Sequence, residues 1–85
     1  MEIIYSPRFQ KGYKKLPVRT KELIEKKEKI FRNNPFDHRL KTHKLRGPLA
    51  DFYAWSVNDQ YRIIFEFIDG GIVRLYDVGT HDIYE

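Results

Sequence analysis

The sequence contains no cysteine among its 85 residues, only one methionine and one tryptophan, and no long apolar run. Without cysteine the chain forms neither a disulfide framework nor a thiolate metal site. No segment approaches the roughly 18 consecutive apolar residues that suggest a membrane-spanning helix. The first residues, Met1 to Ile4, lack the basic and then apolar order of a targeting segment. We therefore expect a cytoplasmic protein that does not contact the membrane.

Motifs for bound cofactors are also missing. The sequence has no glycine-rich phosphate loop, no P-loop and no nucleophile elbow. Its three histidines are scattered, and none stands at ligand spacing with a carboxylate. We expect neither a cofactor nor a metal ion.

Enough apolar residues are present for a core, because 41% of the chain is hydrophobic and 15% is aromatic. A chain of 85 residues has room for one core, so residues 1–85 are predicted to form a single domain.

The charge is divided unevenly along the chain. Residues 1–50 carry 14 Lys and Arg against 5 Asp and Glu, a net charge of +9, whereas residues 51–85 carry 2 against 7, a net charge of −5. A basic half of this kind favours an acidic partner, either nucleic acid or an acidic protein segment. The alternative is that the lysines only form the solvated faces of amphipathic helices.

The first half of the chain predicts a strand and two helices. Residues 2–5 are β-branched and aromatic, as in a strand. Ser6 is a good N-cap and Pro7 suits the first helical position, so a helix should begin there and end before Pro17. A second amphipathic helix is predicted over residues 18–32, and the short connection makes the pair an antiparallel hairpin.

The second half has the two-residue period of strands. Residues 52–57, 61–67 and 72–78 are predicted strands, separated by turns at 58–59 and at the Gly70-Gly71 pair. Together they predict an antiparallel meander. The expected fold class is α+β, with an N-terminal strand and an antiparallel helical hairpin packed on an antiparallel β-sheet.

Residues 35–51 lack a clear period and are rich in basic side chains, with a helical turn expected near Arg39. Long irregular segments in small domains are usually functional. His43 lies here among the candidate phosphate-binding residues Lys41, Lys44 and Arg46. Neighbouring cations disfavour the charged imidazolium, so His43 is expected to be neutral and able to act as a base. An ordinary basic surface loop is an equally good interpretation of this segment alone.

Three residues of the second half are further candidates. Arg62 interrupts the most apolar strand, and a buried lone guanidinium is prohibitively costly, so it should face solvent or a carboxylate. His81 follows the last strand directly, and histidine exchanges protons near neutral pH. Tyr84 is either a ring on which a base stacks or a hydrophobic anchor. Together with His43, these residues suggest a site that cleaves phosphodiester bonds.

Four segments carry a resemblance to a known family. They are the hairpin end at Asn34-Pro35, the loop of residues 42–47, the strand of residues 61–65 and the closing residues 78–84. With these, the chain resembles the RelE/ParE-like toxins of bacterial toxin–antitoxin modules, near the YafQ-type ribosome-dependent RNases.

The resemblance implies an endoribonuclease of the mRNA interferase type, which acts on mRNA in the ribosome and is held in a complex by a cognate antitoxin. It implies metal-independent cleavage, in which the 2′-hydroxyl attacks the adjacent phosphate and a cyclic phosphate results. His81 matches the catalytic C-terminal histidine of the family. His43 matches a loop histidine of some YafQ-like members, and Arg62 matches the strand arginine that stabilises transition-state charge.

The sequence departs from the family at two places. YafQ-like members carry a carboxylate just before the arginine strand, where this chain has Gln60 preceded by Asp59. Many relatives end with an aromatic residue four positions after the histidine, whereas Tyr84 stands three positions after His81.

Two alternatives keep the fold but change the function. One is a ParE-like toxin that inhibits DNA gyrase by binding, and the other is a catalytically inactive homologue that only binds an antitoxin. The presence of two histidines argues against the gyrase inhibitor, because an inhibitor that acts by binding needs no pair of proton carriers.

Overall fold

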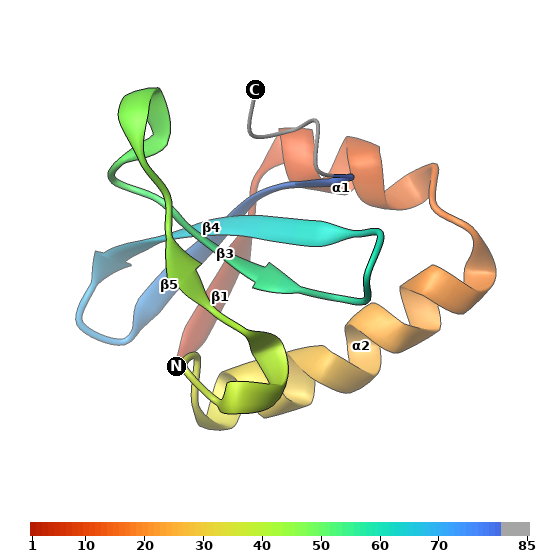
Figure 1. Ribbon diagram of the computed structural model, residues 1–85, viewed down its shortest axis with the longest axis horizontal. Helices are drawn as coiled ribbons and strands as arrows, with labels where there is room; N and C mark the ends of the chain where they lie inside the picture. Colours follow the sequence, from red (N-terminus) through yellow and green to blue (C-terminus); the bar gives the residue numbers. More distant parts are fainter. Residues whose placement is uncertain (81–85) are drawn as a thin grey trace.

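The computed structural model describes residues 1–80, which form five strands, two α-helices and two 3₁₀ turns (Figure 1). In chain order they are β1 (Glu2–Tyr5), α1 (Pro7–Lys14), α2 (Val18–Asn33), η1 (His38–Leu40), β2 (His43–Lys44), η2 (Gly47–Leu49), β3 (Tyr53–Ser56), β4 (Arg62–Asp69) and β5 (Ile72–Gly79). No helix among these residues is long and apolar enough to cross a membrane.

Helix α1 begins where the sequence predicts. The Ser6 hydroxyl accepts a hydrogen bond from the Phe9 backbone N–H at 3.0 Å and donates one to the Tyr76 carbonyl at 2.7 Å. It therefore caps the helix and fastens it to β5. The glycine at position 12 permits close packing, because a Cβ atom there would meet both Cγ1 and the carbonyl oxygen of Val78 at 3.3 Å.

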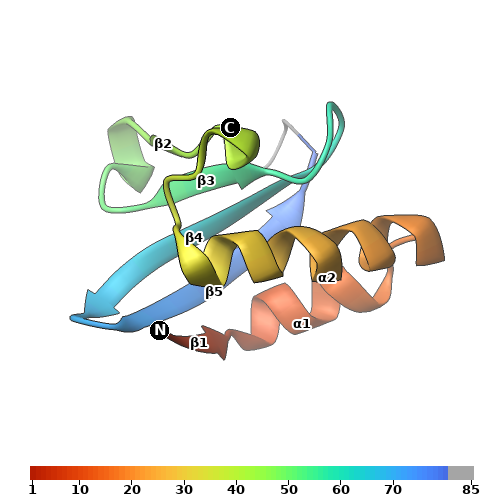
Figure 2. The same ribbon diagram turned by 90° about the horizontal axis from the view of Figure 1, so that it is seen from below.

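Helices α1 and α2 run antiparallel and cover one face of the sheet, as the predicted hairpin requires (Figure 2). Phe31 of α2 is fully buried between the sheet and the hairpin. Its ring centroid lies 5.6 Å from that of Trp55 and 4.9 Å from that of Phe65. These rings join the aliphatic side chains of β4 and β5 in one core on the helical side of the sheet.

The sheet has the strand order β1-β5-β4-β3-β2. The three long strands form the predicted antiparallel meander, and the predicted α+β class is confirmed. The sequence did not indicate where the first strand would pair: β1 lies beside β5 and runs parallel to it.

The segment between α2 and β3 is more regular than expected. The helical turn predicted near Arg39 is confirmed as η1, which is followed by the two-residue strand β2 and by η2. Strand β2 pairs with β3 through His43 opposite Ala54 and Lys44 opposite Tyr53. Two residues are too few to show a period in the sequence, which is why this strand was not predicted.

Candidate functional site

The face of the sheet opposite the helices, which we call the open face, carries two of the candidate residues, Arg62 and His43. Side chains alternate between the two faces of a strand. Since Ile63 and Phe65 enter the core beneath the helices, Arg62 belongs to the open face. By the same alternation, Ala54 lies on the open face because Trp55 is in the core.

His43 shares the open face, because residues directly opposite in an antiparallel pair point to the same side and His43 is opposite Ala54. The imidazole is exposed, and its Nδ1 atom lies 3.2 Å from the Lys41 carbonyl oxygen. A carbonyl only accepts hydrogen bonds, so Nδ1 is the donor in this contact. In a neutral imidazole this arrangement would leave the lone pair on Nε2.

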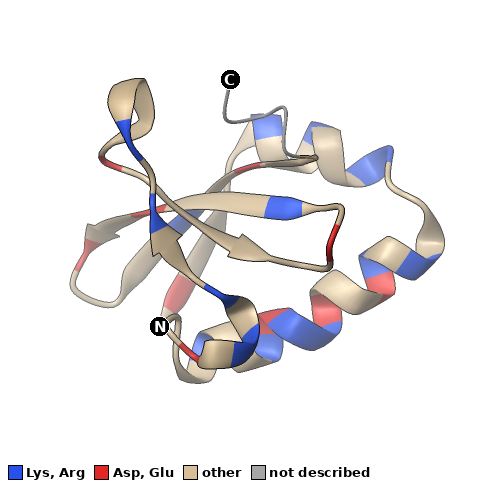
Figure 3. Cartoon of the chain, in the orientation of Figure 1, with Lys and Arg blue, Asp and Glu red and all other residues tan. Residues whose placement is uncertain are grey.

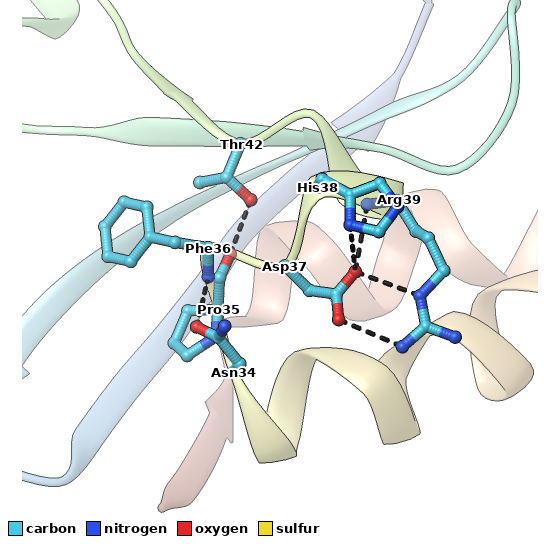
Figure 4. Close-up of polar contacts among 7 residues, drawn as sticks. All are labelled: Asn34, Pro35, Phe36, Asp37, His38, Arg39 and Thr42. Carbon is cyan, nitrogen blue, oxygen red and sulfur yellow. Dashed lines mark hydrogen bonds and ion pairs between the residues drawn. The ribbon is translucent and has the colours of Figure 1, made fainter.

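The turn before His43 is held by side chains (Figure 4). The Asp37 carboxylate accepts hydrogen bonds from the backbone N–H, Nε and a terminal nitrogen of Arg39, each at 2.9 Å. These bonds hold the pKa of Asp37 well below its usual range. The Thr42 hydroxyl donates to the Pro35 carbonyl at 2.5 Å. The position of β2 is therefore fixed by several polar contacts.

Arg62 is the first residue of β4, opposite Ser56 of β3 on one side and Gly79 of β5 on the other. One of its terminal nitrogens donates to the carbonyl oxygens of Asn58, at 2.7 Å, and Tyr61, at 3.2 Å. These bonds turn the guanidinium toward the β3–β4 turn at the end of the sheet.

Gly79 stands two positions before His81 in the sequence. The predicted residues His81 and Tyr84 lie outside the described residues 1–80.

His43 and Arg62 both lie on the open face. Their strands are separated by β3, and their partners Ala54 and Ser56 are two residues apart on it. From sheet dimensions, the two Cα atoms are roughly 12 Å apart. A phosphate group between the two side chains is within reach of both, because each extends several ångströms from its backbone.

The predicted phosphate-binding residues do not form one group. Lys44 is opposite Tyr53, whose ring stacks on Phe65 on the helical side, so Lys44 lies on the other face from His43. Arg46 is exposed at the N-cap of η2. Lys41 precedes β2 and has a left-handed backbone, with φ of 52°. Figure 3 shows Lys and Arg residues both along α2 and along the segment that leads into β2.

Other charged side chains near the open face are paired. Arg74 donates to the Glu66 carboxylate at 2.9 and 2.5 Å. Arg8 of α1 reaches Asp77 of β5 at 3.0 Å, and its guanidinium lies over the Tyr76 ring, 5.5 Å from the centroid. Neither ion pair was expected from the sequence, because each joins residues whose proximity depends on strand register or helix packing.

Within residues 1–80, the open face holds neither a metal-binding group nor the cavity described below. Among residues 1–80, no group of three or more His, Asp or Glu side chains is placed to hold a metal ion. A cavity of about 330 Å³ lies between α1 and α2 and is lined in part by Phe9, Tyr13, Ile24 and Glu25. It is on the helical side and therefore does not include the residues of the open face.

Several solved structures share this fold. YafQ from E. coli strain BL21(DE3) is 23% identical, with 96% of this chain and 94% of that chain covered and a TM-score of 0.79. A YoeB/ParE toxin from Agrobacterium tumefaciens is 16% identical, with 95% and 99% covered and a TM-score of 0.79. The E. coli DinJ–YafQ toxin–antitoxin complex matches with 23% identity, 96% and 93% covered and a TM-score of 0.76.

Comparison of sequences gives no relative: no protein-family model matches the chain, and no curated protein matches it. The likeness therefore rests on the path of the backbone over nearly the whole length of both chains. The chain has the fold of the RelE/ParE-like toxins.

Proposed function

We propose that the protein is the toxin of a toxin–antitoxin module and an endoribonuclease that cleaves mRNA on the ribosome. The observation that carries the proposal is the placement of Arg62 on the open face with His43, directly opposite the Gly79 that leads to His81 in the sequence. A guanidinium and imidazoles at one sheet end are the groups that phosphodiester cleavage needs.

Arg62 is proposed to stabilise the transition state. As the 2′-oxygen attacks phosphorus, negative charge grows on the non-bridging oxygens, and a planar guanidinium binds two such oxygens at once. The turn carbonyls that bond one of its nitrogens hold the group in place before substrate arrives. A lysine would supply the charge without this fixed geometry.

The two histidines are proposed to move the protons. One imidazole accepts the proton of the 2′-hydroxyl as the new oxygen–phosphorus bond forms, and the other protonates the 5′-oxygen as its bond to phosphorus breaks. The products are a 2′,3′-cyclic phosphate and a 5′-hydroxyl. With Nδ1 donating to the Lys41 carbonyl, the Nε2 atom of a neutral His43 would be the one to accept this proton. Tyr84 is retained as a candidate for positioning a base, and Lys41, Lys44 and Arg46 as candidates for contacts with RNA phosphates.

A protein antitoxin is the proposed partner. YafQ and YoeB, whose folds this chain shares, each form a complex with an antitoxin: DinJ–YafQ from E. coli and YoeB–YefM from Staphylococcus aureus. The net charge of +9 on residues 1–50 favours an acidic segment in such a partner.

The test is cleavage of mRNA on translating ribosomes by the purified chain, compared with Arg62→Ala and His81→Ala. We expect cleavage by the wild type, strong loss in both variants and a cyclic phosphate end on the product. Full activity in both variants would contradict the assignment of the site. Inhibition of purified DNA gyrase without RNA cleavage would instead support the binding toxin, and growth unaffected by expression without antitoxin would support an inactive homologue.

A further inference from the structure

Lys27 is a half-buried lysine of α2 that lies outside the proposed catalytic residues. It lies on the apolar stripe of α2, three residues after Ile24 and four before Phe31, both of which are buried. Its Nζ atom is 3.5 Å from the Ser56 carbonyl oxygen, a long contact with a neutral acceptor. Among residues 1–80, no carboxylate lies within 4 Å of this ammonium.

The register of the sheet explains why the Ser56 carbonyl can accept a hydrogen bond from Lys27. The Val57 N–H donates to the Tyr61 carbonyl, so Val57 and Tyr61 form a hydrogen-bonded pair. The next pair, Ser56 and Arg62, then has its backbone groups pointing outward. The Ser56 carbonyl is therefore directed toward the β2 side of β3.

Continuing the β2–β3 register by two residues would place Lys41 opposite Ser56. The strand does not continue, because Lys41 has a left-handed backbone and its N–H donates to the His38 carbonyl at 3.2 Å. The Lys41 N–H therefore does not bond to the Ser56 carbonyl, and the Lys27 ammonium contacts that carbonyl in its place. The early end of β2 thus brings an ammonium from α2 to the edge of the sheet beside Lys41.

The two lysines have the same charge and lie close enough to affect each other. Burial lowers the pKa of Lys27, and the charge of Lys41 lowers it further, against a smaller opposite effect of Asp59. Two ammonium groups held near each other repel, and an anion between them would remove that cost.

This pair is aligned with the proposed catalytic arginine. Ser56, whose carbonyl Lys27 contacts, is the direct partner of Arg62 on β4, and Arg62 is in turn opposite Gly79. Lys41 stands two residues before His43, at the end of β2 nearest Ser56. An RNA strand with one phosphate at Arg62 could therefore bring a neighbouring phosphate to the lysines.

We propose that Lys27 and Lys41 form a phosphate-binding subsite at the end of β2, which takes an RNA phosphate next to the scissile one. The inference rests on the proposed function for its substrate class. The subsite adds a residue of α2 to a site otherwise built from the strands. Lys27 would position the RNA and would take no part in the cleavage reaction.

The test is the salt dependence of binding to a short single-stranded oligouridylate. Each phosphate contact on a single strand contributes about 0.7 to the slope of log affinity against log salt. We expect Lys27→Gln, which keeps a donor for the Ser56 carbonyl but removes the charge, to lower the slope by about 0.7. Lys27→Arg should retain the wild-type slope. Lys29→Gln, at an exposed position of the same helix, should also leave it unchanged.

An unchanged slope in a folded Lys27→Gln variant would overturn the subsite. If Arg62→Ala still abolishes cleavage in that case, the proposed function stands without it. If the wild type neither binds nor cleaves RNA, the subsite can still be tested with inorganic phosphate. Its binding is then monitored by the NMR signal of the Lys27 methylene group next to the amine. A saturable shift that is lost in Lys41→Gln supports the subsite, and the absence of any shift overturns it.

Discussion

The two faces of the sheet in this protein differ in what their residues contact. On the helical side, Phe31, Trp55 and Phe65 are fully buried and contact one another through their rings. On the open face, His43 is exposed and Arg62 is bonded to turn carbonyls. Neighbouring residues of one strand therefore differ in role: the first face provides stability, and the second carries residues that we propose for binding and catalysis.

The largest effect is expected on the helical side. Phe31→Ala removes a fully buried ring between α2 and the sheet and leaves a cavity, at a cost of about 3–5 kcal/mol. Urea unfolding of the variant measures this loss. Cleavage per folded molecule should stay near the wild-type value; a specific loss of cleavage without a loss of stability would show that the two faces are not separate.

Arg62→Ala is the reverse experiment on the open face. Removing a charge-stabilising donor is expected to lower cleavage on ribosomes by a factor on the order of 10² to 10³. Because the side chain is only partly buried, the unfolding free energy should change by less than about 1 kcal/mol. The matched control is Arg74→Gln, on the same face but paired with Glu66, which should retain activity.

Gly12→Ala tests the contact of α1 with β5. Alanine favours the helix by about 1 kcal/mol, but its Cβ would press on the Val78 carbonyl, and overpacking costs about 1–3 kcal/mol. We expect a net loss of about 1 kcal/mol in thermal or urea unfolding. Gly70→Ala, where a Cβ meets nothing within 4 Å, is the control and should be nearly neutral.

The smallest effect concerns the turn before His43 and depends on pH. The lowered pKa of Asp37 means that its carboxylate stabilises the fold fully above its ordinary pKa of about 4, and that this contribution is lost as the pH falls below that value. The stability difference between wild type and Asp37→Asn should therefore be largest near neutral pH and shrink in acid.

Local patterns were sufficient for most of the fold. Ser6 and Pro7 predicted the start of α1, and the two-residue period of residues 61–67 predicted β4, because caps and alternation depend on neighbouring residues alone. The parallel pairing of β1 with β5 was not predicted, since it joins residues about 70 positions apart and no local pattern specifies the partner.

The site was predictable only as a set of residue types. Arg62 was recognised because an arginine interrupts an apolar strand, and its open-face position follows from alternation. The separation of Lys44 from His43 depends on β2, a strand too short to have a period. The contact of Lys27 with the Ser56 carbonyl could not be predicted, because it depends on the point at which β2 ends. His81 and Tyr84 remain predictions.

The parallel pairing of β1 with β5 has a consequence for synthesis. Residues 2–5 are made about 70 residues before their partners, residues 72–75. Since β5 lies between β1 and β4 and bonds both, β1 has no place in the sheet until β5 has been made. Arg62 likewise has no Gly79 to pair with before that point, so the sheet of this domain is completed late in its synthesis.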